Sequence, residues 1–203
     1  MTQSTVVLAT KNRGKVREFL ALLPGDIAIK TLDEMGMSAP PETGLTFAEN
    51  ATIKALGISA LCDAIVVADD SGLEVHALGG APGVWSARFA GEPADDERNI
   101  DLLLAKLQGV PDKDRTARFV CSVIVSRGDQ VLLESSGFCD GVVGHERRGT
   151  NGFGYDPIFI LPNGRTMAEL TPEEKKTLSH RAHAFRQVAE PFFELVTSEP
   201  RRS

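Results

Sequence analysis

The chain has 203 residues, of which 42% are hydrophobic and 25% are charged. These values are ordinary for a soluble globular protein, and they exclude a largely disordered chain, a collagen and a disulfide scaffold. Asp and Glu number 28 against 22 Lys and Arg, a formal net charge of −6. Because sequence-independent nucleic-acid binding relies on Lys and Arg to neutralise phosphates, we expect no nucleic acid as a partner.

Cysteine spacing and apolar runs indicate a cytoplasmic protein. Cys62, Cys121 and Cys139 are widely spaced and form no Cys-x-x-Cys pair, so neither a structural zinc site nor a disulfide framework is expected. Residues 1–10 lack the basic and long apolar regions of a secretory signal. The longest apolar run, residues 64–68, has the length of a strand, so we expect no membrane partner.

The first part of the chain predicts alternating strands and helices. Short β-branched runs favour strands, and apolar residues at helical spacing favour helices. Thr46 and Glu49 match the capping box that begins a helix. In chain order we expect a strand over residues 5–10, a helix over 15–23, a strand over 27–31, an exposed loop over 33–45 and a helix from Thr46 to about Leu61.

The middle of the chain adds further strands around one helix. Turn-forming residues punctuate the apolar runs. We expect a strand over residues 64–68 that Asp69–Gly72 breaks, a tight loop over 79–83, a helix over 94–108, antiparallel strands over 117–126 and 130–137 joined by 127–129, and a third strand at 142–143.

The last part predicts a glycine-rich loop, a short strand and a long helix. Thr171-Pro172-Glu173-Glu174 is a second capping-box pattern, with Pro at the first helical position. We expect a loop over residues 149–154, a strand over 158–161, a helix over 179–196 that Pro191 kinks or ends, and a frayed tail over 199–203. The whole pattern is that of a mixed α/β chain whose polar, glycine-rich segments lie where strands end.

The first candidate site is the segment of residues 10–15, which lies between a strand and a helix start. Backbone N–H groups there favour an anion, and three cations with a glycine suit a polyphosphate. The segment is not a Walker A loop, because Ala9 and Val16 stand where that motif requires Gly and Ser or Thr. A basic surface turn is the alternative. The candidate residues are Thr10, Lys11, Asn12, Arg13, Gly14 and Lys15.

The second candidate site is Asp69-Asp70-Ser71-Gly72, placed after an apolar strand. Ligands bind at strand carboxyl ends in open α/β sheets, and adjacent carboxylates need a cation to neutralise them. Hard oxygen ligands indicate Mg²⁺, whereas a solvated turn is the alternative. Glu42 is a possible third carboxylate or a solvated loop residue. Lys54 lies four residues after Asn50, on the same helix face, and suits either a phosphate or the surface.

Two further segments have the composition of a binding site. Residues 149–156 place Phe153 and Tyr155 among three glycines, which suits base stacking if the loop is exposed; Phe153 folded into the core is the alternative. Residues 173–181 place His180 and Arg181 in the first turn of the last helix. Cations there oppose the helix dipole, which indicates donors to a ligand oxygen, or else a solvated helix start.

Together these segments resemble the inosine triphosphate pyrophosphatase family, of the bacterial dITP/XTP pyrophosphatase type. The matching segments are in the family's order and at its spacing, and they span nearly the whole chain. They are ATKNRGKVREF (9–19), ETGLTFAENATIKA (42–55), ADDSGLEVHALGGAPGVWSARFAG (68–91), GTNGFGYDPIF (149–159) and MAELTPEEKKTLSHR (167–181). Five matches in register are more specific than any one of them.

The resemblance implies one α/β domain over residues 1–203, an elongated fold of two lobes around a long twisted mixed sheet. The active site would lie in the cleft between the lobes. It also implies a homodimer, dependence on Mg²⁺, and hydrolysis of a purine nucleoside triphosphate to the monophosphate and pyrophosphate. ITP, dITP and XTP would be the substrates, removed from the nucleotide pool.

The resemblance also implies a role for each candidate residue. Residues 10–15 and Lys54 would hold the polyphosphate, with Lys175 beside it. Asp70, helped by Glu42 and Asp69, would bind Mg²⁺ and activate the water that attacks the α-phosphorus. The other residues would contact the substrate: Phe153 by stacking on the base, His180 and Arg181 by donating to its 6-oxo group, Asp156 by shaping the same pocket, and Ser71, Gly154 and Tyr155 by further substrate contacts.

Two other hypotheses remain at this level. A nucleotide sensor would have the same pocket without turnover, but binding alone does not need a water-activating carboxylate. A Maf-like enzyme would act on pyrimidine or modified nucleotides, which the Ser-His-Arg segment at residues 179–181 opposes. Release of pyrophosphate from ITP, with and without Mg²⁺, distinguishes the three.

Overall fold

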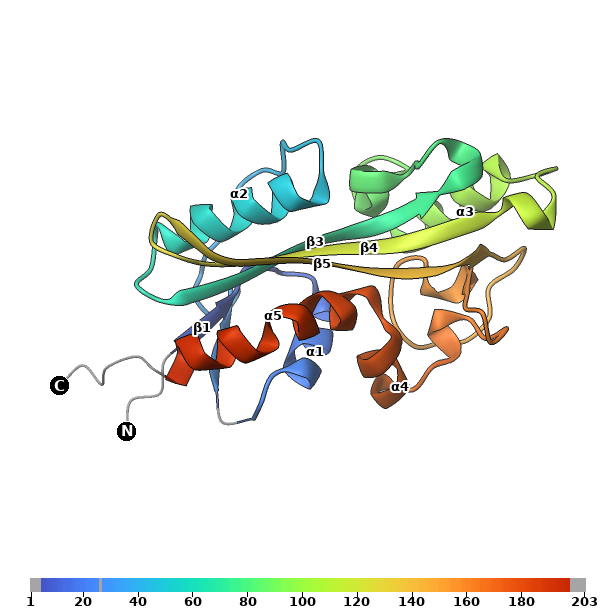
Figure 1. Ribbon diagram of the computed structural model, residues 1–203. Coiled ribbons are helices and arrows are strands. Elements are labelled where there is room, and N and C mark those ends of the chain that lie inside the picture. The colour runs from blue at the N-terminus through green and yellow to red at the C-terminus, as the bar shows by residue number, and fades with distance from the viewer. Residues whose placement is uncertain (1–4, 26, 198–203) are drawn as a thin grey trace. The chain divides into compact units, whose positions relative to one another are not determined.

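The computed structural model describes residues 5–25 and 27–197 (Figure 1). The predicted frayed tail, residues 199–203, lies outside the described residues. The strands are β1 (Thr5–Leu8), β2 (Ala28–Thr31), β3 (Ile65–Val75), β4 (Thr116–Arg127), β5 (Gln130–Val143) and β6 (Phe159–Ile160). The α-helices are α1 (Arg13–Leu22), α2 (Phe47–Ser59), α3 (Asp96–Lys106), α4 (Pro172–Leu178) and α5 (His180–Thr197). None of the helices in the described part of the chain is long and apolar enough to cross a membrane.

The strands form one six-stranded sheet in the order β2-β1-β3-β4-β5-β6. β1 pairs in parallel with β2 and with β3, whereas β5 and β6 pair antiparallel. The expected α/β class and mixed sheet are therefore confirmed. The elongated shape and the cleft between lobes stay predictions, as does the single domain.

The described residues form two compact units. Unit 1 is drawn from Met1–Asp70, Cys121–Gly137 and Arg181–Ser203, and unit 2 from Ser71–Val120 and Phe138–His180. The unit boundaries fall inside β3, β4 and β5, so each of these strands contributes residues to both units.

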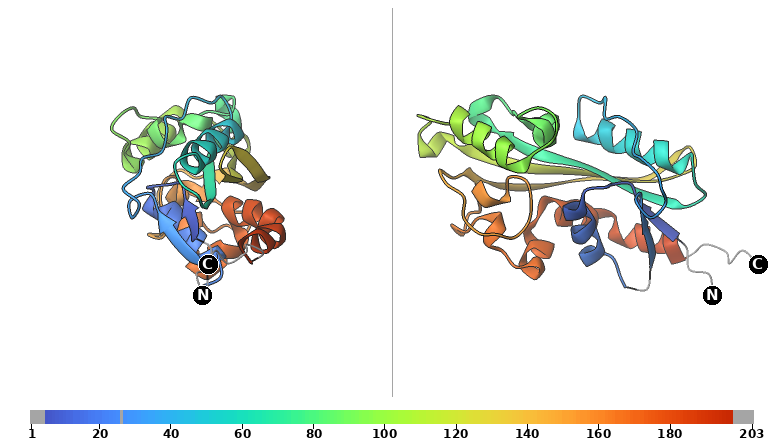
Figure 2. Two further views of the ribbon diagram at one scale, coloured as in Figure 1. Left: turned by 90° about the vertical axis from the view of Figure 1, so that its left-hand side faces the viewer. Right: turned by 180° about the vertical axis from the view of Figure 1, so that it is seen from behind.

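Unit 1 has a sheet covered on both faces (Figures 1 and 2). Successive residues of a strand point to opposite faces, and β1 is apolar on both. Val6 and Leu8 pack with residues of α1 and α5. Val7 packs with residues of α2 on the other face. This double burial explains why β1 reads as a continuous apolar run.

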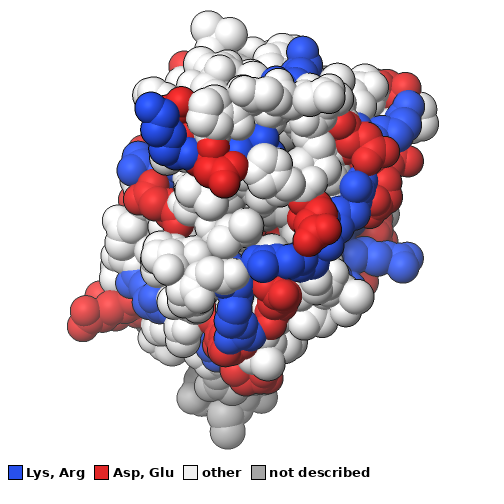
Figure 3. All heavy atoms as spheres, turned by 90° about the vertical axis from the view of Figure 1, so that its right-hand side faces the viewer, with Lys and Arg blue, Asp and Glu red and all other residues white. Residues whose placement is uncertain are grey.

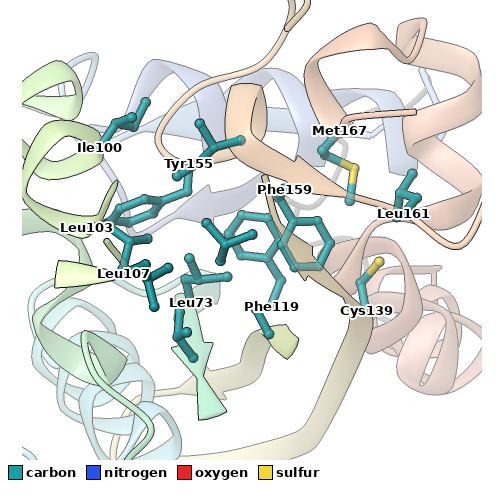
Figure 4. Packing of buried hydrophobic residues seen from close by; sticks show 14 of the residues in the cluster. Leu73, Ile100, Leu103, Leu107, Phe119, Cys139, Tyr155, Phe159, Leu161 and Met167 are labelled. Atoms are coloured by element: carbon teal, nitrogen blue, oxygen red, sulfur yellow. The ribbon is translucent and has the colours of Figure 1, made fainter. Parts of the chain in front are cut away.

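Unit 2 has its own core, built around the ends of three long strands and α3 (Figure 4). Leu73 of β3, Phe119 of β4 and Cys139 of β5 are buried together with Leu103 of α3. Tyr155 and the buried hydrophobic residues that follow it in the chain pack in the same core. Because Tyr155 is only 4% exposed, the interpretation of residues 149–156 as an exposed aromatic loop does not hold for this residue.

The largest difference from the expected elements lies in β3. Asp69–Gly72 does not break the strand but lies inside its eleven residues, Ile65–Val75. Leu73 and Val75 continue the buried pattern beyond the polar residues, so pairing and burial override the turn preference of Asp, Ser and Gly. The carboxylates therefore lie in mid-strand and not at a strand end.

Three other boundaries differ. α1 begins at Arg13, two residues early, because Asn12 caps it. β5 runs unbroken from Gln130 to Val143, so the separate strand expected at residues 142–143 is the end of β5. Pro191 lies inside α5 without ending it.

Both capping boxes are confirmed. The Thr46 hydroxyl accepts from the Glu49 N–H, and the Thr171 hydroxyl accepts from the Glu174 N–H, each 3.2 Å away. Glu174 also binds the Arg165 guanidinium through both oxygens, at 2.6 and 2.9 Å. The bonds from Arg165, and then that from the Thr171 N–H, lower the pKa of Glu174 to about 2. On the face drawn in Figure 3, Lys and Arg side chains lie among Asp and Glu side chains, an arrangement that allows such ion pairs.

The Glu174 contacts predict a defined acid dependence of stability. A carboxylate whose folded pKa is depressed stabilises the fold above its unfolded pKa, about 4.3, and loses that contribution as the pH falls towards the folded value. Glu174→Gln should therefore lower the melting temperature at pH 7, with the difference from wild type shrinking between about pH 5 and pH 2. Glu173→Gln, in the same helical turn, is the control. A difference for Glu174→Gln that does not vary with pH would contradict the prediction.

Candidate functional site

The segment of residues 10–15 is a capped helix start. The Asn12 carboxamide oxygen accepts from the N–H groups of Gly14, at 2.8 Å, and Lys15, at 3.1 Å. The Asn12 N–H in turn donates to the Thr10 hydroxyl at 3.1 Å. These N–H groups were expected to bind an anion, but Asn12 already satisfies two of them. The capped turn therefore leaves fewer N–H groups for an anion than expected, and it sets the directions of its side chains.

Its cations point in different directions. Lys11 is exposed and contacts Asp33 at 3.6 Å and the Ser38 hydroxyl at 3.3 Å. Arg13 is also exposed. The Lys15 ammonium lies 3.0 Å from an oxygen of Asp69, and its side chain is only 12% exposed. Lys15 alone among these three is thus directed into a charged cluster.

Asp69 is the centre of a buried ion-pair network in unit 1. One of its oxygens accepts from Arg181 Nη2 at 2.9 Å and Nε at 3.2 Å, and also faces Lys15. Arg181 has no exposed surface and binds Glu18 of α1 as well. Burial alone would raise the pKa of Asp69, but Lys15, Arg181 and Lys54 hold it well below its usual range.

Asp70 belongs to a second set of contacts, formed with α2. Its oxygens accept from Asn50 Nδ2 at 3.1 Å and from Lys54 Nζ at 3.4 Å. Lys54 also donates to Glu42 at 2.6 Å. Asn50 and Lys54 lie one helical turn apart and are both buried, so the alternative of a surface lysine is wrong.

The pKa values of Asp70 and Lys54 are both raised, but by different causes. Burial raises the pKa of Asp70, and the nearby Lys54 and Lys15 do not cancel that effect. Burial lowers the pKa of Lys54, but Asp70, Asp69 and Glu42 together raise it above its ordinary value. Lys54 is therefore a buried cation held by carboxylates, and Asp70 is a carboxylate with increased proton affinity.

Asp69 and Asp70 do not form a carboxylate pair, contrary to the sequence-based interpretation. Both lie inside β3, where consecutive side chains point to opposite faces of the sheet. Asp69 contacts α1 and α5, whereas Asp70 contacts α2. Across residues 5–25 and 27–197, no group of three or more His, Cys, Asp or Glu is placed to hold a metal. The expected set of Glu42, Asp69 and Asp70 is therefore not assembled.

Unit 2 holds a separate cluster around the glycine-rich loop. One Asp156 oxygen accepts from the Phe153 N–H at 2.9 Å and from Lys175 Nζ at 2.5 Å. The Lys175 ammonium also lies 5.1 Å from the centre of the Phe153 ring. Phe153 is half-buried and lies outside the hydrophobic core cluster of this unit. Lys175 was expected beside the polyphosphate-binding residues, but its contacts here are with the aromatic loop.

Backbone geometry holds this loop in place. Gly152 has a φ of +83°, and a Cβ there would collide with the Asp156 carboxylate. The Gly154 N–H donates to Asp96 of α3 at 2.7 Å. The Tyr155 hydroxyl donates to the Ser86 carbonyl at 2.8 Å, so Tyr155 anchors the loop from within the core.

Asp96 was not identified from the sequence. Asp95 is the N-cap of α3, and its side chain accepts from the Arg98 N–H. A second Asp in the first turn looks like a simple complement to the helix dipole. Its contact with Gly154, 58 residues away, depends on tertiary structure.

His180 and Arg181 begin α5, as expected, but their environments differ. His180 is 5% exposed and stacks on Phe119 in unit 2. The buried guanidinium of Arg181 is bound to Asp69 and Glu18, and these contacts favour a structural role over one in reading a base. Ser71 lies half-buried within β3.

The comparisons with known proteins place the chain among close relatives. A model of the Ham1 family matches residues 6–191. The dITP/XTP pyrophosphatase of Geobacillus kaustophilus is 50% identical over 200 residues, covering 97% of this chain and 98% of the relative. That of Halalkalibacterium halodurans is 50% identical over 185 residues, covering 90% and 95%. A solved HAM1 protein from Coxiella burnetii has a TM-score of 0.84 at 40% identity, covering 94% of this chain and 99% of that one.

Proposed function

The chain belongs to the Ham1 family, and we propose that it hydrolyses non-standard purine nucleoside triphosphates to the monophosphate and pyrophosphate. The substrates are ITP, dITP and XTP, and the reaction removes them from the nucleotide pool. The homodimer, which the resemblance implies, and the cytoplasmic location, which the cysteine spacing and apolar runs indicate, stay predictions.

The convergence of Asp70 and Glu42 on one buried cation carries this proposal. Both carboxylates approach Lys54 Nζ, at 3.4 and 2.6 Å. A position where two carboxylates meet a cation suits the reaction of a triphosphate, because phosphoryl transfer depends mainly on positioning and charge neutralisation. The raised pKa of Asp70 suits a group that takes a proton from water.

In the proposed reaction, Asp70 accepts a proton from a water molecule as the water oxygen attacks the α-phosphorus. The bond between the α-phosphorus and the bridging oxygen breaks, and pyrophosphate leaves. Lys54 and Lys15 neutralise charge on the phosphates, and the remaining contacts to the polyphosphate come from the other residues of the capped segment, Thr10, Lys11, Asn12, Arg13 and Gly14.

The donor set fits a hard divalent cation. Asp70 and Glu42 each direct a carboxylate oxygen at Lys54 Nζ, and Mg²⁺ commonly binds through one or two carboxylates together with substrate phosphates and water. These two residues would hold Mg²⁺, which supplies neutralisation of phosphate charge and lowers the pKa of a bound water. Asp69, the third expected ligand, contacts Lys15 and Arg181 instead. We therefore assign it the role of positioning these two cations.

The base is read by the cluster of unit 2. Phe153 stacks on the purine, and Asp156 and Lys175 hold Phe153 in position. His180 donates a hydrogen bond to the 6-oxo group of the purine. The 6-amino group of adenine is itself a donor and would not accept this bond. A buried mismatch of this kind can reject a substrate by roughly 10⁴-fold. Gly154, Tyr155 and Ser71 complete the predicted substrate contacts.

GTP also carries a 6-oxo group, so its rejection needs a second contact that opposes the 2-amino group. A fixed donor such as a backbone N–H in the loop of residues 149–154 would do this. The expected order is therefore ITP or XTP far above GTP, with ATP very poor. Measuring pyrophosphate released from each of the four nucleotides tests the proposal. Binding of ITP without release of pyrophosphate would instead identify a nucleotide sensor.

Metal dependence is a separate prediction. Carboxylate and phosphate oxygens, without Cys or clustered His, favour Mg²⁺ or Mn²⁺ over Zn²⁺. Hydrolysis of ITP should therefore vanish in EDTA and return when Mg²⁺ is added in excess of the chelator. The measurement is the initial rate of pyrophosphate release across a titration of free Mg²⁺. Full activity in excess EDTA would refute the metal dependence.

A further inference from the structure

The imidazole of His180 lies flat against the ring of Phe119 on β4. The ring centroids are 4.8 Å apart, and the planes differ by 12°. Both side chains are buried, with 5% and 6% of their surface exposed. A face-to-face contact of this kind restrains the tilt of the imidazole, whose χ2 torsion is otherwise broad.

Phe119 is itself held by the core of unit 2. Its ring packs against Phe159 of β6 with centroids 4.5 Å apart and an interplanar angle of 47°. Figure 4 shows the two rings against each other among the buried residues of this core. Close packing leaves such a ring little freedom to move, so Phe119 is a rigid platform.

Stacking uses the face of the imidazole, whereas its nitrogens hydrogen-bond in the plane of the ring. A carbonyl oxygen also prefers donors close to its own plane. The direction in which His180 donates is therefore set by the orientation of the imidazole plane, and Phe119 fixes that plane.

We propose that Phe119 is a positioning residue for base discrimination, which acts by holding His180 in the plane that recognises a 6-oxo purine. This inference rests on the proposed function. It assigns part of the preference for ITP over ATP to a buried aromatic residue that touches neither substrate nor metal.

The test compares Phe119→Leu with Phe159→Leu. Both variants remove a buried aromatic ring from the same core, but only Phe119 stacks on His180. The quantity measured is the ratio of kcat/KM for ITP to kcat/KM for ATP, which does not depend on the fraction of folded enzyme. We expect the ratio to fall about five- to tenfold in Phe119→Leu, the scale of one ordinary hydrogen bond, and by less than about twofold in Phe159→Leu, in which the Phe119 ring still stacks on His180. Phe119→Tyr keeps the ring and should keep the ratio.

Proton NMR of the His180 ring tests the geometry without turnover. The ring current of Phe119 should shift the imidazole protons upfield, and this shift should be lost in Phe119→Leu and kept in Phe159→Leu. His180→Gln identifies the signals by their disappearance. An unchanged ITP/ATP ratio in Phe119→Leu, or an equal fall in both Leu variants, would overturn the inference while leaving the proposed function intact. A wild-type enzyme without preference for ITP would overturn both.

Discussion

Asp70→Asn is expected to lower the rate of ITP hydrolysis by at least about 10²-fold, the usual scale for loss of a general base. The substitution keeps the size of the side chain and removes its charge and proton affinity. Asp70 is buried, and its contacts with Asn50 and Lys54 place it on the α2 face of β3. Glu42 continues to hold Lys54 in the variant, so the fold should be retained.

The measurement is kcat for pyrophosphate release, with circular dichroism as the check on folding. Asp63→Asn is the matched control, because Asp63 is an exposed carboxylate that contacts Arg127, outside the residues assigned to the site. It should leave kcat unchanged. Near-normal turnover in folded Asp70→Asn would remove Asp70 from the role of base.

Arg181→Ala is expected to destabilise the protein by about 3–5 kcal/mol, the range for removing one partner of a buried ion pair. The substitution leaves Asp69 fully buried with Lys15 as its remaining close cation, and it removes a partner of Glu18. If Arg181 acts through these ion pairs and not on the base, hydrolysis of ITP and ATP should fall by the same factor. Urea unfolding at pH 7 measures the free energy of unfolding.

The loss of stability should depend on pH with a defined sign. In the wild type the depressed pKa of Asp69 stabilises the fold above its unfolded pKa, about 3.9. Without Arg181, only Lys15 and Lys54 remain to hold down the pKa of Asp69 against burial, so the variant has less of this stabilisation at neutral pH. As the pH falls below about 3.9, wild type and variant both lose the stabilisation that comes from the depressed pKa of Asp69. The difference between their free energies of unfolding should therefore narrow in acid.

Arg186→Ala is the control for this prediction. Arg186 lies on the same helix but is exposed, so its removal should change stability by no more than about 0.5 kcal/mol. If Arg181→Ala instead kept its stability and lost only ITP hydrolysis, with ATP hydrolysis unchanged, Arg181 would read the base as the family resemblance implies.

Features that depend on near neighbours could be predicted from the residues alone. Thr46 and Glu49, like Thr171 and Glu174, satisfy each other's backbone partners within one helical turn, so a short pattern is enough to predict the helix start. The apolar runs of β1 and β4 likewise predict buried strands. The family follows from five segments in register, which needs only their order and spacing.

The contacts of the charged residues could not be predicted from the sequence, because they depend on how distant segments pack. The turn-forming residues Asp69–Gly72 lie in a strand because β3 is paired and buried along its length, and this pleat sends Asp69 and Asp70 to opposite faces. Arg181 reaches Glu18 across 163 residues of chain, and Tyr155 is drawn into a core. Each outcome depends on which segments pack together, since burial penalises every charge that lacks a partner and rewards every apolar ring it covers. The segments that pack together are distant in sequence, so local sequence patterns do not predict their contacts.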